Sequence, residues 1–437
     1  MQYYSTNKKA PMATLEKAVV KGLAEDKGLY MPESIKPLPK EFFDNIDKMS
    51  FQEIAYTVAD AFFGEDVDAE SLKKIVYDTL AFDCPVVPVT DNIYTLELFH
   101  GPTLAFKDVG ARFMARLLQY FLKKNGNGNE NGNVNVLVAT SGDTGSAVAN
   151  GFLGVEGIHV YVLYPKGKVS PIQECQFTTL GKNITAIEVD GVFDDCQALV
   201  KNAFMDAELN AHMKLTSANS INVARFLPQS FYYFNAYARM KALGKADELV
   251  MCVPSGNFGN ICSALFGHQM GLPIKRFVAA NNANDIFYNY LQTGEYHPQP
   301  SKATLANAMD VGDPSNFARI YDLYKGDHKA ITSLISGATY KDEQIRQTMR
   351  ECYAETGYVL DPHGACGYQA LKDLLQPGEV GVFCETAHPA KFKEKVDDIL
   401  GTDIEIPQRL QDFMKGTKQS IAMSKDFADF KAFLMAE

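Results

Sequence analysis

The segment His100-Gly101-Pro102-Thr103-Leu104-Ala105-Phe106-Lys107-Asp108 lies between an expected strand and an expected helix. Residues 93–99 have the β-branched and aromatic content of a strand, and Gly-Pro ends that pattern. From Val109 onward, apolar side chains recur at helical spacing. Lys107 therefore stands at the start of a helix, where burial and the helix dipole lower the pKa of an ammonium group and Asp108 opposes them. A lysine of low pKa is a nucleophile for an aldehyde. On this segment alone, a lysine that only extends from the helix into solvent explains the pattern equally well.

Composition excludes several classes of protein. The chain has 437 residues, which predicts two or three domains, and its net charge of -11 argues against a nucleic-acid or anionic-membrane partner. The first residues form no secretory signal, and no apolar run reaches membrane-spanning length, so we expect a cytoplasmic protein. Eight cysteines without a C-x-x-C pair predict reduced, mostly buried thiols. Eight histidines without ligand spacing predict no metal site.

Three parts of the chain differ in pattern. Residues 1–95 are mainly helical, with a capping-box pattern from Ser50 to Glu53, and we interpret them as a scaffold. The Asn-Gly repeats of residues 123–133 predict an exposed, mobile loop. Beyond it, strand, glycine loop and helix alternate, which predicts a parallel α/β sheet with ligands at the carboxyl ends of its strands.

Two glycine loops of this alternating region have the features of anion sites. Ser141-Gly142-Asp143-Thr144-Gly145 and Gly256-Asn257-Phe258-Gly259-Asn260 each follow a strand and precede a helix, whose free N–H groups attract an anion. Neither loop is a P-loop or a G-x-G-x-x-G dinucleotide motif. Taken singly, each is better explained as a tight turn between a strand and a helix.

A third polar stretch extends from Thr216 to Phe226 and ends near an arginine. Arg225 suits two-pronged recognition of phosphate or carboxylate, and the serines and asparagines before it can complete the contacts. For Asn219 or Ser220 alone, the capping of the next helix is the better explanation. Together, one imine-forming lysine, two backbone anion sites and one polar anion pocket suit pyridoxal phosphate and an amino-acid substrate.

These motifs, with Thr386-Ala387-His388-Pro389-Ala390-Lys391-Phe392, resemble the threonine synthases. The resemblance is to their bacterial and fungal branch, within the tryptophan-synthase-β-like, fold type II pyridoxal-phosphate enzymes. It covers nearly the whole chain. It implies an α/β fold of two open, twisted, mostly parallel sheets flanked by helices, with an N-terminal mainly helical extension. We expect that extension at residues 1–95, a small domain with Lys107 at its edge at 96–225, and a large domain with the cofactor-phosphate loop at 226–437.

The resemblance also implies roles for individual residues. Lys107 would hold the cofactor as a Schiff base and then move protons, and Thr386 would bind the pyridine nitrogen. The cofactor phosphate would be held by Gly256, Asn257, Phe258, Gly259 and Asn260. The substrate carboxylate would be bound by Ser141, Gly142, Asp143, Thr144 and Gly145, with Asp143 near the cofactor's O3′. Many fold type II relatives have asparagine at the Asp143 position. The substrate phosphate would be bound by Thr103, Ser217, Asn219, Ser220, Asn222 and Arg225.

The activity implied is conversion of O-phospho-L-homoserine and water to L-threonine and phosphate, by a monomer or homodimer. One alternative is a related phospholyase or threonine dehydratase that releases 2-oxobutyrate. Another is a non-catalytic amino-acid-binding protein of the same fold, which the presence of Lys107 and the glycine loop at 256–260 disfavours.

Overall fold

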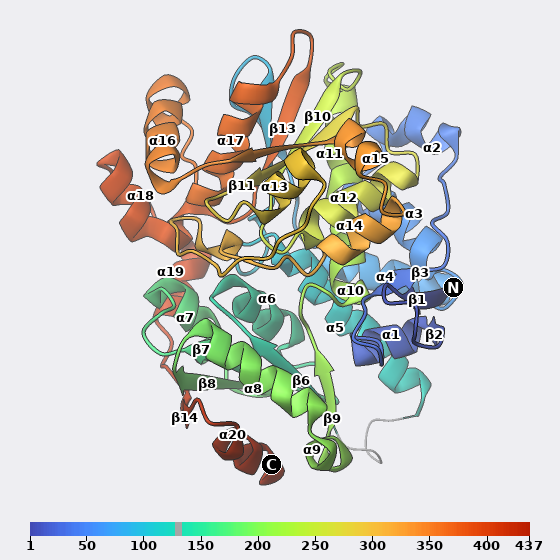
Figure 1. The fold of residues 1–437 in the computed structure, drawn as a ribbon, viewed down its shortest axis with the longest axis vertical. Helices are drawn as coiled ribbons and strands as arrows, with labels where there is room; N and C mark the ends of the chain where they lie inside the picture. The colour runs from blue at the N-terminus through green and yellow to red at the C-terminus, as the bar shows by residue number, and fades with distance from the viewer. Residues whose placement is uncertain (127–132) are drawn as a thin grey trace.

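The structure is a computed structural model that describes residues 1–126 and 133–437 (Figure 1). Residues 127–132, most of the loop expected at 123–133, lie outside the described residues. Helix α5 (Lys107–Lys124) ends just before that segment, and strand β6 (Val134–Ala139) begins just after it.

Two parallel sheets organise the chain. In the larger sheet only β4 runs antiparallel to its neighbour, and in the smaller one all neighbours are parallel. The order across the larger sheet is β12 (Ile335–Thr339), β11 (Arg276–Asn281), β10 (Leu249–Pro254), β13 (Val380–Glu385), β5 (Ile93–Glu97) and β4 (Val86–Pro88). The order across the smaller sheet is β14 (Ile421–Ser424), β8 (Ile184–Asp190), β7 (Ile158–Pro165), β6 and β9 (Lys214–Ser217). The predicted parallel α/β architecture is confirmed.

Helices cover both faces of the larger sheet. Successive residues of β10 show this, because Met251 and Val253 join one apolar cluster while Val250 and Cys252 join another. Helices of the first face are α11 (Phe231–Ala242), α12 (Gly259–Gln269), α13 (Ile286–Thr293), α14 (Phe317–Leu323) and α15 (His328–Leu334). Those of the second are α16 (Asp342–Thr356), α17 (Pro362–Leu374) and α18 (Lys393–Leu400).

The smaller sheet is covered in the same way. Val136 and Val138 of β6 face α5, α6 (Asp143–Phe152) and α7 (Pro171–Thr178), and the short helix α10 (Val223–Phe226) also packs on α5. Leu137 faces the opposite side, which is covered by α8 (Phe193–Met205), α9 (Ala207–His212) and α20 (Phe427–Met435). Figure 1 shows this sheet in the lower half of the molecule, with α8 in front of it.

The N-terminal extension is mainly helical, as expected, and contacts both sheet layers. Its helices are α1 (Leu15–Lys21), α2 (Lys40–Asn45), α3 (Phe51–Phe63) and α4 (Ala69–Thr79). A small antiparallel sheet of β2 (Ala13–Thr14), β1 (Gln2–Ser5) and β3 (Tyr30–Pro32) lies beside α1. The Ser50 hydroxyl accepts the Glu53 N–H at the start of α3, which confirms an N-cap there. Helix α3 packs on α11, whereas α4 packs on α5.

The two sheets exchange segments along the chain. Strand β5 belongs to the larger sheet, although most of it lies before the small domain expected at 96–225. Strand β14 and α20 belong to the smaller sheet, although they lie within the expected large domain at 226–437. Helix α19 (Gln408–Met414) packs on α7 and connects α18, on the larger sheet, to β14 in the smaller sheet. Strand β14 covers the edge of β8 that would otherwise have unpaired backbone groups. The domain boundaries themselves stay a prediction.

Candidate active site

The loop that carries Lys107 is fixed to the segment that follows β13. The Phe106 N–H donates to the Thr386 carbonyl at 2.8 Å, and the His388 N–H donates to the Leu104 carbonyl at 3.1 Å. Leu104 adopts a φ of +60° to make this turn. Lys107 and Thr386 are far apart in the sequence. These bonds place them on neighbouring loop segments at the carboxyl end of the larger sheet.

Lys107 is the first residue of α5, as predicted, and its amine donates to the Thr144 hydroxyl at 2.7 Å. Burial, with a smaller contribution from the cations Arg225 and Lys391, lowers the pKa of Lys107 to about 8, although the charge of Asp143 opposes this shift. We expected Asp108 to be the opposing charge. Instead, Asp108 accepts the hydroxyl and N–H of Thr103, because successive helical side chains point about 100° apart.

The loop at 141–145 begins helix α6 of the smaller sheet. Gly142 has a φ of +147°, and a side chain there would collide with the Gln173 amide. The Thr140 hydroxyl accepts the N–H groups of Gly142 and Gly145. The N–H groups of Asp143 and Thr144 donate to no acceptor in the described part of the chain. These two N–H groups at a helix N-terminus fit an anionic ligand, while Ser141 is exposed at the rim.

The loop at 256–260 has the properties of an anion cradle. A Cβ at Gly256 would lie 2.8 Å from the Ala308 carbonyl oxygen, so glycine lets the loop approach the chain behind it. Phe258 caps α12 in the left-handed conformation, with a φ of +66°. Among the described residues, the N–H groups of Phe258, Gly259 and Asn260 and the buried Asn260 Nδ2 have no hydrogen-bond partner. These unpaired donors at a helix N-terminus fit the phosphate of a cofactor.

The polar stretch before Arg225 contacts the loop at 256–260. The Asn257 amide donates to the Ser220 hydroxyl at 2.7 Å. Arg225 is buried and donates to the Ala218 carbonyl, and its Nε has no partner within residues 1–126 and 133–437. No carboxylate in those ranges forms an ion pair with it, and burial lowers its pKa to about 10. A buried guanidinium without a carboxylate fits a bound anion.

Other residues expected at the substrate phosphate have structural contacts. Thr103 is fully buried and uses its hydroxyl on Asp108. Asn222 caps α10 and donates to the Val19 carbonyl at 2.8 Å. The Ser217 hydroxyl accepts the Asn219 N–H. That these residues bind substrate stays a prediction, and we rank Arg225 above them.

Three contributors to the site were not predicted. Lys391 is buried and forms an ion pair with Asp143 at 2.5 Å. Tyr232 and Tyr233 both donate to the Asn260 side-chain oxygen, so its buried Nδ2 is the donor of that amide that has no partner among the described residues. A lysine between Ala390 and Phe392 is the one local pattern that could have drawn attention, because a buried lysine requires a partner.

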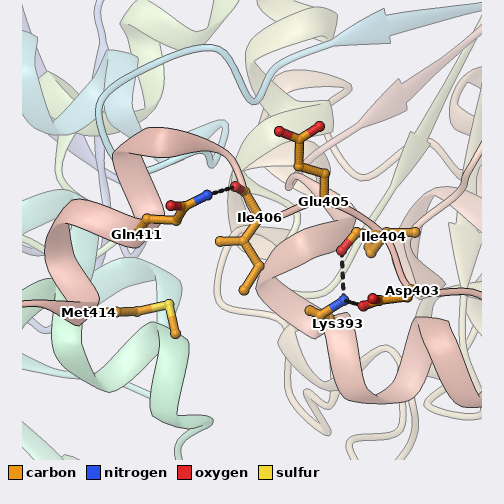
Figure 2. A pocket seen from close by; sticks show the side chains of 7 residues that line it. All are labelled: Lys393, Asp403, Ile404, Glu405, Ile406, Gln411 and Met414. Carbon is orange, nitrogen blue, oxygen red and sulfur yellow. Dashed lines mark hydrogen bonds and ion pairs between the residues drawn. The ribbon is translucent and has the colours of Figure 1, made fainter.

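One pocket, with a volume of about 530 Å³, is lined by none of the predicted site residues. Figure 2 shows the side chains that do line it. It lies between α18 and α19. Its one cation, Lys393, already contacts Asp397, Asp403 and the Ile404 carbonyl, and the pocket is also lined by the Glu405 carboxylate, so its lining does not favour an anionic ligand. Among the described residues, no group of three or more His, Cys, Asp and Glu side chains could hold a metal ion.

Comparison with known proteins agrees with this geometry. Residues 86–383 match the family model described as pyridoxal-phosphate dependent enzyme, and residues 2–80 and 364–434 match the threonine synthase N terminus and C-terminal models. The threonine synthase of Serratia marcescens is 43% identical over 435 residues, covering 100% of this chain and 99% of the relative. The chain belongs to the threonine synthase family.

Solved structures of threonine synthases superimpose on the whole chain. The Escherichia coli enzyme has a TM-score of 0.92 at 42% identity, with all of both chains covered. A pyridoxal-phosphate-bound threonine synthase from Brucella melitensis has a TM-score of 0.93 at 32% identity, covering 100% of this chain and 99% of that one. The expected family, fold class and cofactor are confirmed: the protein is a threonine synthase-type lyase that depends on pyridoxal phosphate. No helix in the described ranges is long and apolar enough to cross a membrane.

Proposed function

We propose that the protein converts O-phospho-L-homoserine and water into L-threonine and phosphate, with pyridoxal phosphate held at Lys107. The observation that carries the proposal is the position of the Lys107 amine. It has a pKa near 8 and contacts Thr144 at the N-terminus of α6, while the unpaired donors of 258–260 and the buried cation Arg225 supply further anion sites.

The proposed roles follow from the chemistry of each group. When bound, pyridoxal phosphate supplies a sink for the electrons of a broken C–H bond. The Lys107 amine, once free, removes and returns protons at Cα and Cβ of the substrate, because its low pKa keeps part of it neutral at pH 7. The Asp143 and Thr144 N–H groups bind the substrate carboxylate. Arg225 meets the charge of the departing phosphate, which leaves readily only when that charge is neutralised.

Product analysis tests the proposal. The cofactor-loaded protein is given O-phospho-L-homoserine, and phosphate, threonine and 2-oxobutyrate are measured in the same samples. Equal amounts of phosphate and threonine are expected. Lys107→Ala should lower kcat by at least roughly 10²-fold, whereas Lys123→Ala, at the exposed end of the same helix, should not. Phosphate with 2-oxobutyrate would identify a lyase, and binding without turnover would refute catalysis.

The proposal extends to setting and assembly. We place the enzyme in the cytoplasm as a monomer or homodimer, without a nucleic-acid partner. The eight cysteines support a reducing compartment, since all are free thiols and seven are buried. Light scattering of the purified protein measures the assembly, and a trimer or larger species would contradict it.

A further inference from the structure

Lys391 is a buried cation at the junction of the two sheets. It belongs to the short turn of helix Pro389–Phe392 that follows β13, and its side chain is 0% exposed. Its amine contacts the Asp143 carboxylate at 2.5 Å and donates to the Thr103 carbonyl at 2.9 Å. Burying an ammonium is costly unless it is paired, so Lys391 depends on Asp143.

Asp143 depends on Lys391 in return. Burial alone would raise the pKa of Asp143, but the charges of Lys391 and Lys107 outweigh burial and hold that pKa below its usual value. The Gln173 amide donates to the same oxygen at 3.1 Å, and Asp143 lies in the first turn of α6, where the helix dipole favours an anion. Asp143 is therefore ionised and carries a negative charge, which an asparagine at the same position would not.

The position of this carboxylate relates it to the cofactor. Pyridoxal phosphate has its 3-hydroxyl next to the aldehyde carbon that reacts with lysine, so a group near the Lys107 amine would also lie near that hydroxyl when the cofactor is bound. An ionised 3-hydroxyl and a carboxylate repel each other, and in a site with little water this repulsion is strong. A bare aspartate would therefore disturb both the cofactor and Lys107.

We propose that Lys391 is a positioning residue that neutralises Asp143, so that an ion pair and not a bare carboxylate lies beside Lys107 and would lie beside the cofactor's 3-hydroxyl. This inference rests on cofactor binding at Lys107. Within the described residues, the charges that act on the pKa of the Lys107 amine are those of Asp143 from α6, Arg225 from α10 and Lys391 itself. The nearby Asp108 carboxylate is already bonded to Thr103.

The test compares wild type, Lys391→Met, Asp143→Asn and the double variant, with the Lys107 pKa as the first readout. In the apoprotein, competitive acetylation across a pH range, followed by mass spectrometry of the Lys107 peptide, measures that pKa. Lys391→Met removes a cation and should raise the Lys107 pKa by about one unit. Asp143→Asn removes the anion and should lower it by about one unit. The double variant should return near the wild-type value.

A second readout uses the loaded protein, in which the pH midpoint of the cofactor's visible absorption should shift in the same directions. Lys391→Arg should restore both readouts. Lys393→Met, an adjacent lysine that pairs with Asp397 and Asp403, is the matched control and should change neither. If Lys391→Met lowers stability but leaves both pKa readouts unchanged, the residue is only structural and the proposal is refuted. Failure of threonine formation by wild type would instead refute the proposed function, because the apoprotein readout does not depend on turnover.

Discussion

The low pKa of Lys107 predicts how fast the apoprotein captures an aldehyde at each pH. Only the neutral amine attacks a carbonyl. With a pKa near 8 instead of the ordinary 10.5, the neutral fraction at pH 7 is about 9% instead of about 0.03%, roughly 300-fold more. The fraction rises about tenfold per pH unit below 8 and then levels off. Capture should therefore become independent of pH above about 9.

Stopped-flow absorbance with excess pyridoxal measures this capture. Because pyridoxal lacks the phosphate of the cofactor, binding of that phosphate by the 256–260 loop does not affect the rate. Nα-acetyl-lysine amide, whose only amine is the side-chain amine, reports the ionisation of the aldehyde itself in the same buffers, so the ratio of the two rates isolates Lys107. The rate for Lys107 divided by the rate for the reference amine should fall steeply between pH 8 and 11. Over this range the neutral fraction of the reference amine still rises, whereas that of Lys107 is already close to its maximum. Lys107→Ala sets the background from surface lysines. A ratio that stays constant up to pH 11 would refute the lowered pKa.

Two substitutions test other parts of the site, and a third tests the start of α17. Thr103→Val removes the hydroxyl that donates to Asp108, and we expect the free energy of unfolding in urea to fall by about 1–3 kcal/mol with KM unchanged; a raised KM at full stability would assign Thr103 to substrate instead. Gly256→Ala places a Cβ 2.8 Å from the Ala308 carbonyl oxygen, and the strain should weaken cofactor binding in equilibrium dialysis by about tenfold or more. Unchanged binding would mean that the loop does not hold the cofactor. Asp361→Ala removes the N-cap of α17 and should cost about 1–2 kcal/mol in the same urea assay, so an unmoved midpoint would contradict the capping role.

Local patterns were sufficient for the elements and the glycine loops, because strands, turns and helix starts depend on neighbouring residues. Lys107 is the first residue of α5, and Ser50 caps α3 in the N-terminal extension, as predicted. Sheet membership could not be predicted in this way. Strand β5 pairs with β13, with Ile93 opposite Gly381, and nothing near residue 93 indicates that partner.

The electrostatics of the site were also only partly predictable. The expectation that Asp108 opposes Lys107 relied on their adjacency in sequence, but adjacent residues on a helix point in different directions. The charge that opposes the lowering of the Lys107 pKa is that of Asp143, which comes close to Lys107 only when α5 and α6 pack together. The Asp143–Lys391 pair likewise joins residues from different sheets, so no spacing in the sequence could reveal it.

The exchange of segments between the two sheets has a consequence for the protein while it is being made. A ribosome delivers the chain from residue 1 onward, and β5 is complete long before its neighbour β13 exists. Strand β8 also waits for its neighbour, since β14 begins only at Ile421. Until then its edge has unpaired N–H and C=O groups that can pair with another chain. Assembly of both sheets is thus completed only after β14 has been synthesised, and until then the edge of β8 must be shielded from other chains.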